Sequence, residues 1–126
     1  MCGIVGIKSN QFNEGKLRRM LALIQHRGPD LLGIYSVKSD GVGLGVARLS
    51  IVDIDNGVQP FVDEVTGIAL AFNGEIYNHH ELRKELKKKN VKFRTVSDTE
   101  VILRLYIDEG DSFLNKLNGQ FALSIW

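Results

Sequence analysis

The sequence predicts a fold of mixed α and β structure, an α+β domain in which neighbouring strands form antiparallel hairpins. Apolar residues recur at helical spacing in residues 17–24, whereas residues 33–54 contain short β-branched stretches interrupted by the turn pair Asp40-Gly41. Later in the chain, polar helix-start patterns precede further apolar residues at helical spacing. Helices and hairpins mixed in this way must bury their apolar faces against each other.

Composition bounds the class of protein. The chain has 126 residues, of which 44% are hydrophobic and 25% charged, which suits one domain with a buried core. Lys and Arg number 16 against 15 Asp and Glu, so the net charge of +1 gives no excess to attract nucleic acid or an anionic membrane. The longest apolar runs, residues 20–24 and 68–72, are far shorter than the roughly 20 residues of a membrane-spanning helix. We therefore expect a soluble protein without nucleic-acid or membrane partners.

The N-terminus and the cysteine content indicate the compartment. Met1-Cys2-Gly3-Ile4 lacks the basic region and apolar stretch of a secretory signal. The cysteine count of 1 excludes an internal disulfide. We therefore expect a reducing, cytoplasmic setting.

The first half of the chain is predicted from local patterns. Residues 4–7 are mostly β-branched and precede a polar turn, which predicts a buried strand. The next helix ends at Gly28-Pro29. Strands follow within residues 33–54, and residues 68–72 form another strand that ends at the turn pair Asn73-Gly74. The apolar stripe of the helix consists of Leu17, Met20, Leu21 and Ile24.

The second half begins with a helix. Asn78 and Glu81 have capping-box spacing and open a helix whose Leu82 and Leu86 face inward. Lysines at 87–89 lie at its end, where solvated cations complement the helix dipole.

A strand is then expected at residues 91–96, before a second capping box at Ser97 and Glu100. The helix that follows carries Val101, Ile102, Leu105 and Tyr106 on one side. A short helix at residues 112–117 leads into a strand at residues 121–126. Because the chain stops inside this apolar strand, we expect a piece of a longer domain that is weakly active or inactive alone and that self-associates through Phe121, Ile125 and Trp126.

The position of the single cysteine is the most informative chemical feature. Removal of Met1 would make Cys2 the N-terminus, so that an α-amine, whose pKa in peptides is near ~8, lies beside the thiol as a general base. The alternative is a small buried hydrophobe, which is the commoner role of a lone cysteine.

Five motifs accompany this cysteine and favour the catalytic interpretation. They are His26-Arg27-Gly28-Pro29-Asp30, Arg48-Leu49-Ser50-Ile51-Val52-Asp53, Gln59-Pro60, Phe72-Asn73-Gly74-Glu75-Ile76-Tyr77-Asn78 and Ser97-Asp98-Thr99-Glu100-Val101-Ile102-Leu103. In this order and at these spacings they resemble the N-terminal glutaminase domain, a class II glutamine amidotransferase, of the glutamine-hydrolysing asparagine synthetases. The resemblance covers essentially the whole chain. Related hexosamine-phosphate and purine-pathway enzymes usually lack the Pro of the first motif and the Gly-Glu-Ile-Tyr-Asn run.

The resemblance implies a fold and a domain division. The family fold is the four-layer αββα sandwich of N-terminal-nucleophile hydrolases, with two antiparallel sheets between helices. Residues 1–126 would form the N-terminal part of that domain, truncated before the later strands. The synthetase domain, which in the family binds ATP and Mg²⁺ and activates aspartate, would be absent, so the chain alone would at most hydrolyse glutamine.

The resemblance also implies the residues of the reaction. Cys2 would attack the glutamine carboxamide to give a γ-glutamyl thioester and ammonia, and the Asn73 amide and the Gly74 N–H would stabilise the oxyanion. Arg48 would bind the α-carboxylate and Glu75 and Asp98 the α-ammonium group. The backbone of Leu49, Ile51 and Val52 would line the pocket.

Simpler roles compete for three of these positions. Asn73-Gly74 is also a common turn pair, Arg48 could form a surface ion pair, and Asp98 in a first helical turn complements the helix dipole. Adjacent His79-His80 lack the i, i+4 spacing of a metal-ligand pair, so we expect no metal site, and His26 is interpreted as structural.

Departures from the family pattern and other functions stay open. Val46-Ala47 and Leu31-Leu32 stand where many members have more polar or aromatic residues, which would alter the pocket entrance without removing a reacting group. The domain could instead feed ammonia to a sugar or another acceptor, or be a catalytically silent regulatory domain of the same fold. Expected partners are glutamine, a C-terminal synthetase domain in the same chain and, as a further prediction, a second copy in a homodimer.

Overall fold

The computed structural model describes residues 2–49 and 58–126. Its helices and strands follow the predicted order with two differences: the short strand β4 was not predicted, and one predicted strand is absent, as described below. Within the described ranges they are β1 (Gly3–Lys8), α1 (Glu14–Ile24), the 3₁₀ helix η1 (Gln25–Arg27), β2 (Leu31–Val37), β3 (Val42–Arg48), β4 (Phe61–Val62), β5 (Ala69–Ile76), α2 (His79–Lys88), α3 (Asp98–Glu109), the 3₁₀ helix η2 (Gly110–Lys116) and β6 (Gly119–Ile125).

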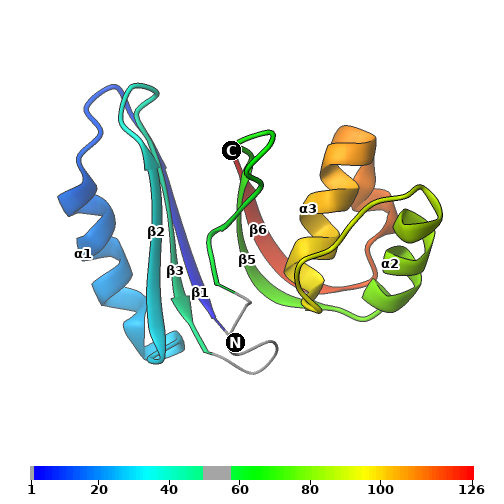
Figure 1. Ribbon diagram of the computed structural model, residues 1–126. Helices are drawn as coiled ribbons and strands as arrows, with labels where there is room; N and C mark the ends of the chain where they lie inside the picture. Colours follow the sequence, from blue (N-terminus) through cyan, green and yellow to red (C-terminus); the bar gives the residue numbers. More distant parts are fainter. Residues whose placement is uncertain (1, 50–57) are drawn as a thin grey trace.

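These elements form four layers (Figure 1). Helix α1 covers the outer face of a sheet with strand order β1-β3-β2, and helices α2 and α3 lie outside a second sheet with order β4-β5-β6. All strand pairs in both sheets are antiparallel. The predicted αββα arrangement is confirmed. No helix among residues 2–49 and 58–126 has the length and apolar character needed to cross a membrane.

Glycines let α1 approach the first sheet closely. Leu17 and Leu21 are the buried residues of α1. A Cβ at Gly43 or Gly45 of β3 would lie 2.8 Å from the side chain of Leu17 or Leu21, respectively, so β3 needs glycine where the helix packs against it. The side chains at the alternate positions, Leu44 and Val46, point to the second sheet and pack with Ala69 and Ala71 of β5. We call this side of β5 its inter-sheet face.

The second sheet and its helices share a larger apolar core. Leu70, Phe72 and Ile76 of β5 pack there with residues of α2 and α3. The members contributed by the helices are Leu82, Leu86, Val101, Ile102, Leu103 and Leu105. These positions confirm the apolar faces that the sequence predicts for both helices.

The strand predicted at residues 91–96 is wrong. The N–H groups of Arg94 and Thr95 donate to the carboxylate of Glu100, at 3.0 and 2.7 Å, and the Thr95 carbonyl accepts from Arg83 Nη1 at 2.8 Å. Because side chains satisfy this backbone, it forms no ladder with a neighbouring strand.

Three local details also differ from expectation. The capping box at Asn78 does not form: its side chain bridges Lys116 O and Asn118 N, at 2.8 and 3.0 Å, and does not cap α2. The lysine at the end of α2 is not simply solvated, because Lys89 Nζ pairs with Asp108 at 2.5 Å. The short helix expected at residues 112–117 is the 3₁₀ helix η2.

Candidate active site

Cys2 lies just before the first strand, on the side of the first sheet that faces the second. It directly precedes β1, whose first residue, Gly3, pairs with Ala47 of β3. The half-buried side chain packs against the cluster that Leu44 and Ala71 help to form between the sheets. Its Sγ lies 3.8 Å from the carbonyl oxygen of Leu49, one of the predicted pocket residues. The thiol therefore faces the second sheet and the segment that leaves β3.

Asn73 lies on the inter-sheet face of β5. Side chains alternate along a strand, so Asn73 projects to the same side as Ala69 and Ala71, the side that Cys2 packs against. Its Oδ1 atom is buried and has no hydrogen-bond partner among the described residues. A buried amide with an unmet hydrogen-bonding atom is unusual in a folded protein and suits a site that receives a polar ligand.

Gly74 lies inside β5, so the prediction that the strand ends in a turn at Asn73-Gly74 is wrong. Gly74 pairs with Phe121 of β6, and β5 continues to Ile76. Its φ of +150° favours glycine, and a Cβ here would lie 2.2 Å from the Gln120 carbonyl oxygen. Glycine is therefore required by the backbone conformation and by the close approach of β6.

The N–H groups of β5 alternate between its two edges. Ala69 N and Tyr77 N donate to the β6 side, to Trp126 O at 2.8 Å and Asn118 O at 2.7 Å. The N–H groups of Phe72, Gly74 and Ile76 consequently face the opposite edge of β5, on the part of that edge that the short strand β4 does not cover.

Side chains hold the two outer members of this trio. Phe72 N donates to Gln59 Oε1 at 2.8 Å, and Ile76 N donates to Asp98 Oδ2 at 3.1 Å. The Gly74 N–H lies between them on the same edge. The resemblance implies that this N–H is the backbone donor to the oxyanion.

Asp98 lies at the end of this edge, beside the residue that follows Glu75. Asp98, the first residue of α3, is half-buried and bonds the N–H of Ile76, the residue next to Glu75. Burial raises the pKa of Asp98 above its ordinary value, while hydrogen bonds from the Ile76 and Thr99 backbone oppose that shift. Glu75 is exposed. Asp98 and Glu75 are the two carboxylates to which the resemblance assigns the α-ammonium group.

Arg48 ends β3 and is 5% exposed. This burial rules out the alternative of a solvated surface arginine. The Asp30 N–H donates to the Arg48 carbonyl oxygen at 3.1 Å, which ties the predicted Arg-Gly-Pro-Asp loop to this strand end.

His79, at the start of α2, lies beside the carboxylate pair. Burial and the neighbouring His80 lower the pKa of His79, partly opposed by the charges of Asp98 and Glu75. Within residues 2–49 and 58–126, no three His, Cys, Asp or Glu side chains are grouped closely enough to hold a metal ion.

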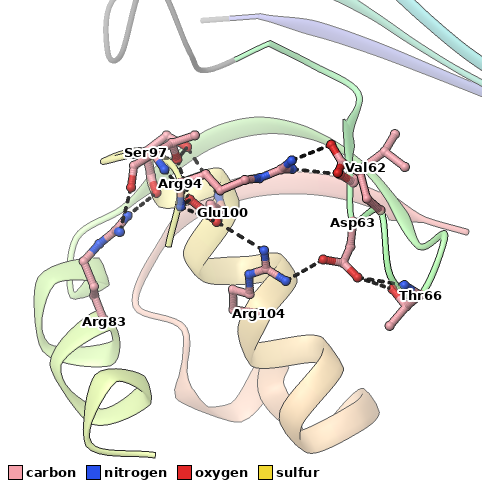
Figure 2. A network of polar contacts seen from close by, with 10 residues as sticks. Val62, Asp63, Thr66, Arg83, Arg94, Ser97, Glu100 and Arg104 are labelled. Carbon is pink, nitrogen blue, oxygen red and sulfur yellow. Dashed lines mark hydrogen bonds and ion pairs between the residues drawn. The ribbon is translucent and has the colours of Figure 1, made fainter. Parts of the chain in front are cut away.

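A buried polar network fixes the N-terminus of α3 (Figure 2). Glu100 is fully buried and its carboxylate accepts from the backbone of Arg94 and Thr95 and from Thr95 Oγ1. Arg104 lies between Glu100, at 3.4 Å, and Asp63, at 2.5 Å. Burial alone would raise the pKa of Asp63, but hydrogen bonds from Thr66 and the charge of Arg104 leave it below its ordinary value.

The predicted capping box at this helix is half formed. Ser97 Oγ accepts from Glu100 N at 3.3 Å, as expected, whereas the Glu100 side chain bonds residues 94 and 95 and does not return to Ser97 N. Arg83 reaches from α2 to the Ser97 carbonyl at 2.7 Å. The network therefore holds the residue that precedes Asp98 from several sides.

The predicted site residues within the described ranges lie before β1, at and after the end of β3, in the second half of β5 and at the start of α3. Ile51 and Val52 lie outside the described residues. Gln59 is a site residue whose role the sequence does not reveal, and its side chain lies at the β5 edge. The spacing of apolar residues that marks helices and strands does not identify Gln59, because Gln59 acts through a single side-chain amide. The motif Gln59-Pro60 is the only sequence feature that marks its position.

Comparison with known proteins agrees with this arrangement. Residues 1–126 match the family model described as glutamine amidotransferase domain. A probable glutamine-hydrolysing asparagine synthetase of Dictyostelium discoideum is 44% identical over 131 residues, which covers 100% of this chain and 23% of that protein. Asparagine synthetase B (glutamine-hydrolysing) of Escherichia coli is 43% identical over 130 residues, again 100% of this chain and 23% of the relative.

Solved structures with the same fold include the glutamine phosphoribosylpyrophosphate amidotransferase from B. subtilis. Its TM-score is 0.83 at 25% identity, over 100% of this chain and 35% of that one. An allosteric regulatory enzyme of purine biosynthesis has a TM-score of 0.84 at 23% identity and shows the fold alone. The chain therefore belongs to the family of glutamine amidotransferase domains, in the form that the glutamine-hydrolysing asparagine synthetases carry.

Proposed function

We propose that this domain hydrolyses glutamine to glutamate and ammonia with Cys2 as the nucleophile. The observation that carries the proposal is the packing of Cys2 on the inter-sheet face of β5, the face from which the Asn73 side-chain amide projects. The Gly74 N–H faces the adjoining strand edge. A nucleophile, a side-chain amide and a backbone N–H are the groups that acyl transfer needs, one to attack and two to stabilise the oxyanion.

The reaction proceeds in two steps. The Cys2 thiol gives its proton to its own α-amine, and the sulfur forms a bond to the carboxamide carbon. The carbon–nitrogen bond then breaks, and the α-amine passes the proton to the leaving nitrogen, which departs as ammonia. Water then cleaves the γ-glutamyl thioester, returning the thiol and releasing glutamate. In both steps the carbonyl oxygen becomes an oxyanion, which the Asn73 amide and the Gly74 N–H stabilise.

Substrate recognition uses opposite charges at the two ends of the amino-acid backbone. Arg48 binds the α-carboxylate, because a guanidinium can bond both oxygens, and Glu75 and Asp98 bind the α-ammonium group. The backbone at Leu49, Ile51 and Val52 lines the side-chain channel. Asp98 thereby serves the ligand as well as the helix terminus.

The ammonia goes to a second domain in the same chain, where it converts aspartate to asparagine with ATP. Support comes from relatives named as glutamine-hydrolysing asparagine synthetases, of which this chain spans 23%. That domain would hold ATP and Mg²⁺, so no step at Cys2 uses either. We place the protein in the cytoplasm, where a reducing environment keeps the thiol free, and the homodimer stays a prediction.

The proposal is tested by covalent labelling of the intact protein with 6-diazo-5-oxo-L-norleucine, an electrophilic glutamine analogue. We expect Met1 to be absent from the mature protein and a single adduct on Cys2, with labelling slowed by added glutamine. Cys2→Ala is the matched control and should take no label. Labelling that ignores glutamine, or that persists in Cys2→Ala, would show that Cys2 is not the nucleophile.

A further inference from the structure

Gln59 lies where the ladder between β4 and β5 stops. Phe61 pairs with Leu70, and the same antiparallel register places Gln59 opposite Phe72. Strand β4 begins only at Phe61, so the ladder does not reach Gln59. The side-chain carboxamide of Gln59 accepts the Phe72 N–H instead, at 2.8 Å. Gln59 is 7% exposed, so this side-chain bond lies in the interior.

The other end of the same carboxamide reaches helix α3. Gln59 Nε2 donates to Thr99 Oγ1 at 3.4 Å, and Thr99 is itself 4% exposed. Phe72 directly precedes Asn73, and Thr99 directly follows Asp98. One buried amide thus joins the neighbour of the proposed oxyanion residue to the neighbour of the proposed ammonium ligand.

We infer that Gln59 is a positioning residue that fixes the oxyanion strand and the ammonium-binding helix relative to each other, an inference that rests on the proposed function. It holds the first N–H of the edge formed by Phe72, Gly74 and Ile76, while Asp98 holds the last. The spacing of these two anchors sets where the Gly74 N–H points. The hydrogen bond to Thr99 holds the start of α3, and therefore Asp98, in a fixed position relative to that edge.

The two bonds of Gln59 can be broken separately. Thr99→Val keeps the size of the side chain but removes the acceptor, whereas Thr99→Ser retains a hydroxyl. Gln59→Met keeps the chain length and removes both bonds. The Thr99 variants therefore test the helix end alone, and Gln59→Met tests both ends.

Binding is measured by calorimetry on the intact protein carrying Cys2→Ala, with two ligands. L-Glutamine contacts Asp98 through its α-ammonium group, and glutaramate is glutamine without that group. We expect Thr99→Val to weaken glutamine binding about tenfold, as for one hydrogen bond, and to leave glutaramate binding unchanged. Thr99→Ser should retain the original affinity for both ligands.

Turnover is measured with Cys2 present. Gln59→Met should lower kcat about 10–100-fold, because the oxyanion donors are misplaced, whereas Thr99→Val should leave kcat within twofold. Adding Thr99→Val to Gln59→Met should weaken glutamine binding no further, because the shared bond is already lost.

Equal weakening of both ligands by Thr99→Val, or an unchanged kcat in Gln59→Met, would overturn the inference. A failure of the proposed function gives a different result: protein with Cys2→Ala and intact Gln59 and Thr99 would then bind no glutamine, and the positioning role would fall with it.

Discussion

Arg48 is the last residue of β3 and Cys2 directly precedes β1, so both are placed by strands that pair in a regular ladder. By contrast, Asp98 and the open edge of β5 are held by side-chain hydrogen bonds between distant parts of the chain. In the first sheet, Gly43 and Gly45 let α1 pack closely on β3. The second has a larger apolar core crossed by a buried polar network.

This difference separates two ways of placing a functional group. A residue at a strand end inherits its position from the regular backbone, so its neighbours can vary as long as the strand forms. A residue at a helix start that no ladder restrains needs specific polar partners, and each partner that is buried becomes costly to remove. We call the first sheet with α1 the first region, and the second sheet with α2 and α3 the second region. The second region should therefore be the more sensitive to single polar substitutions.

The largest effect on stability is expected at Glu100. Glu100→Ala leaves the N–H groups of Arg94 and Thr95 without their acceptor and removes one partner of Arg104. We expect the free energy of unfolding to fall by about 3–5 kcal/mol, as for other broken buried ion pairs. Urea unfolding of the intact protein measures this change.

An acidic residue of the first region is the matched control. Glu14 pairs with Arg18 across one turn of α1 at 2.6 Å, on the surface. Glu14→Ala should cost less than about 1 kcal/mol. Equal losses for Glu14→Ala and Glu100→Ala would contradict the distinction between the two regions.

The next effect separates the chemical roles of the two sheets. Asn73→Ala should lower kcat about 10²–10³-fold with little change in KM, because its amide acts on charge that develops in the transition state. Arg48→Ala should act chiefly through the glutamine KM, because its partner carboxylate is present throughout the reaction. Steady-state kinetics that interchanged the two effects would refute this assignment.

A smaller effect is expected at Asp98, with opposite signs for stability and binding. Asp98→Asn should raise the glutamine KM about 10–100-fold through loss of a charge-assisted bond. It should also stabilise the protein at pH 7, since burial raises the pKa of Asp98 above 3.8 and the folded state carries an unfavourable charge.

The pH dependence of stability shows whether the charge of Asp98 is unfavourable in the folded protein. As pH rises through the raised folded pKa, the original protein loses stability relative to Asp98→Asn, and below 3.8 the two converge because Asp98 is protonated in both states. Thermal unfolding at a series of pH values measures this. A variant less stable than the original at pH 7 would show that the carboxylate is favourably bonded in the folded state.

Sequence patterns predicted the first region well because its signals are local. The helical stripe containing Leu17 and Leu21 and the hairpin at Asp40-Gly41 both form as expected. The four layers required the family resemblance, since periodicity cannot say which faces of two sheets meet.

The second region was harder to predict because distant partners override local signals. Residues 91–96 have strand-like composition, but Glu100 and Arg83 bond their backbone and no ladder forms. Asn73-Gly74 has the composition of a turn, but pairing with β6 keeps it in a strand. The capping side chain of Asn78 is taken by residues 116 and 118. Glu100 is only five residues from Thr95, but the other competing partners lie 12 or more residues away along the chain.

The role of Cys2 is tested most directly by trapping the covalent intermediate. Intact protein turning over glutamine is quenched in acid within milliseconds, digested and analysed by peptide mass spectrometry. We expect one γ-glutamyl group on the peptide that begins with Cys2, in an amount that falls when glutamine is exhausted. A γ-glutamyl group on another residue, or glutamate released in a burst with Cys2 unmodified, would contradict the assignment of Cys2 as the nucleophile.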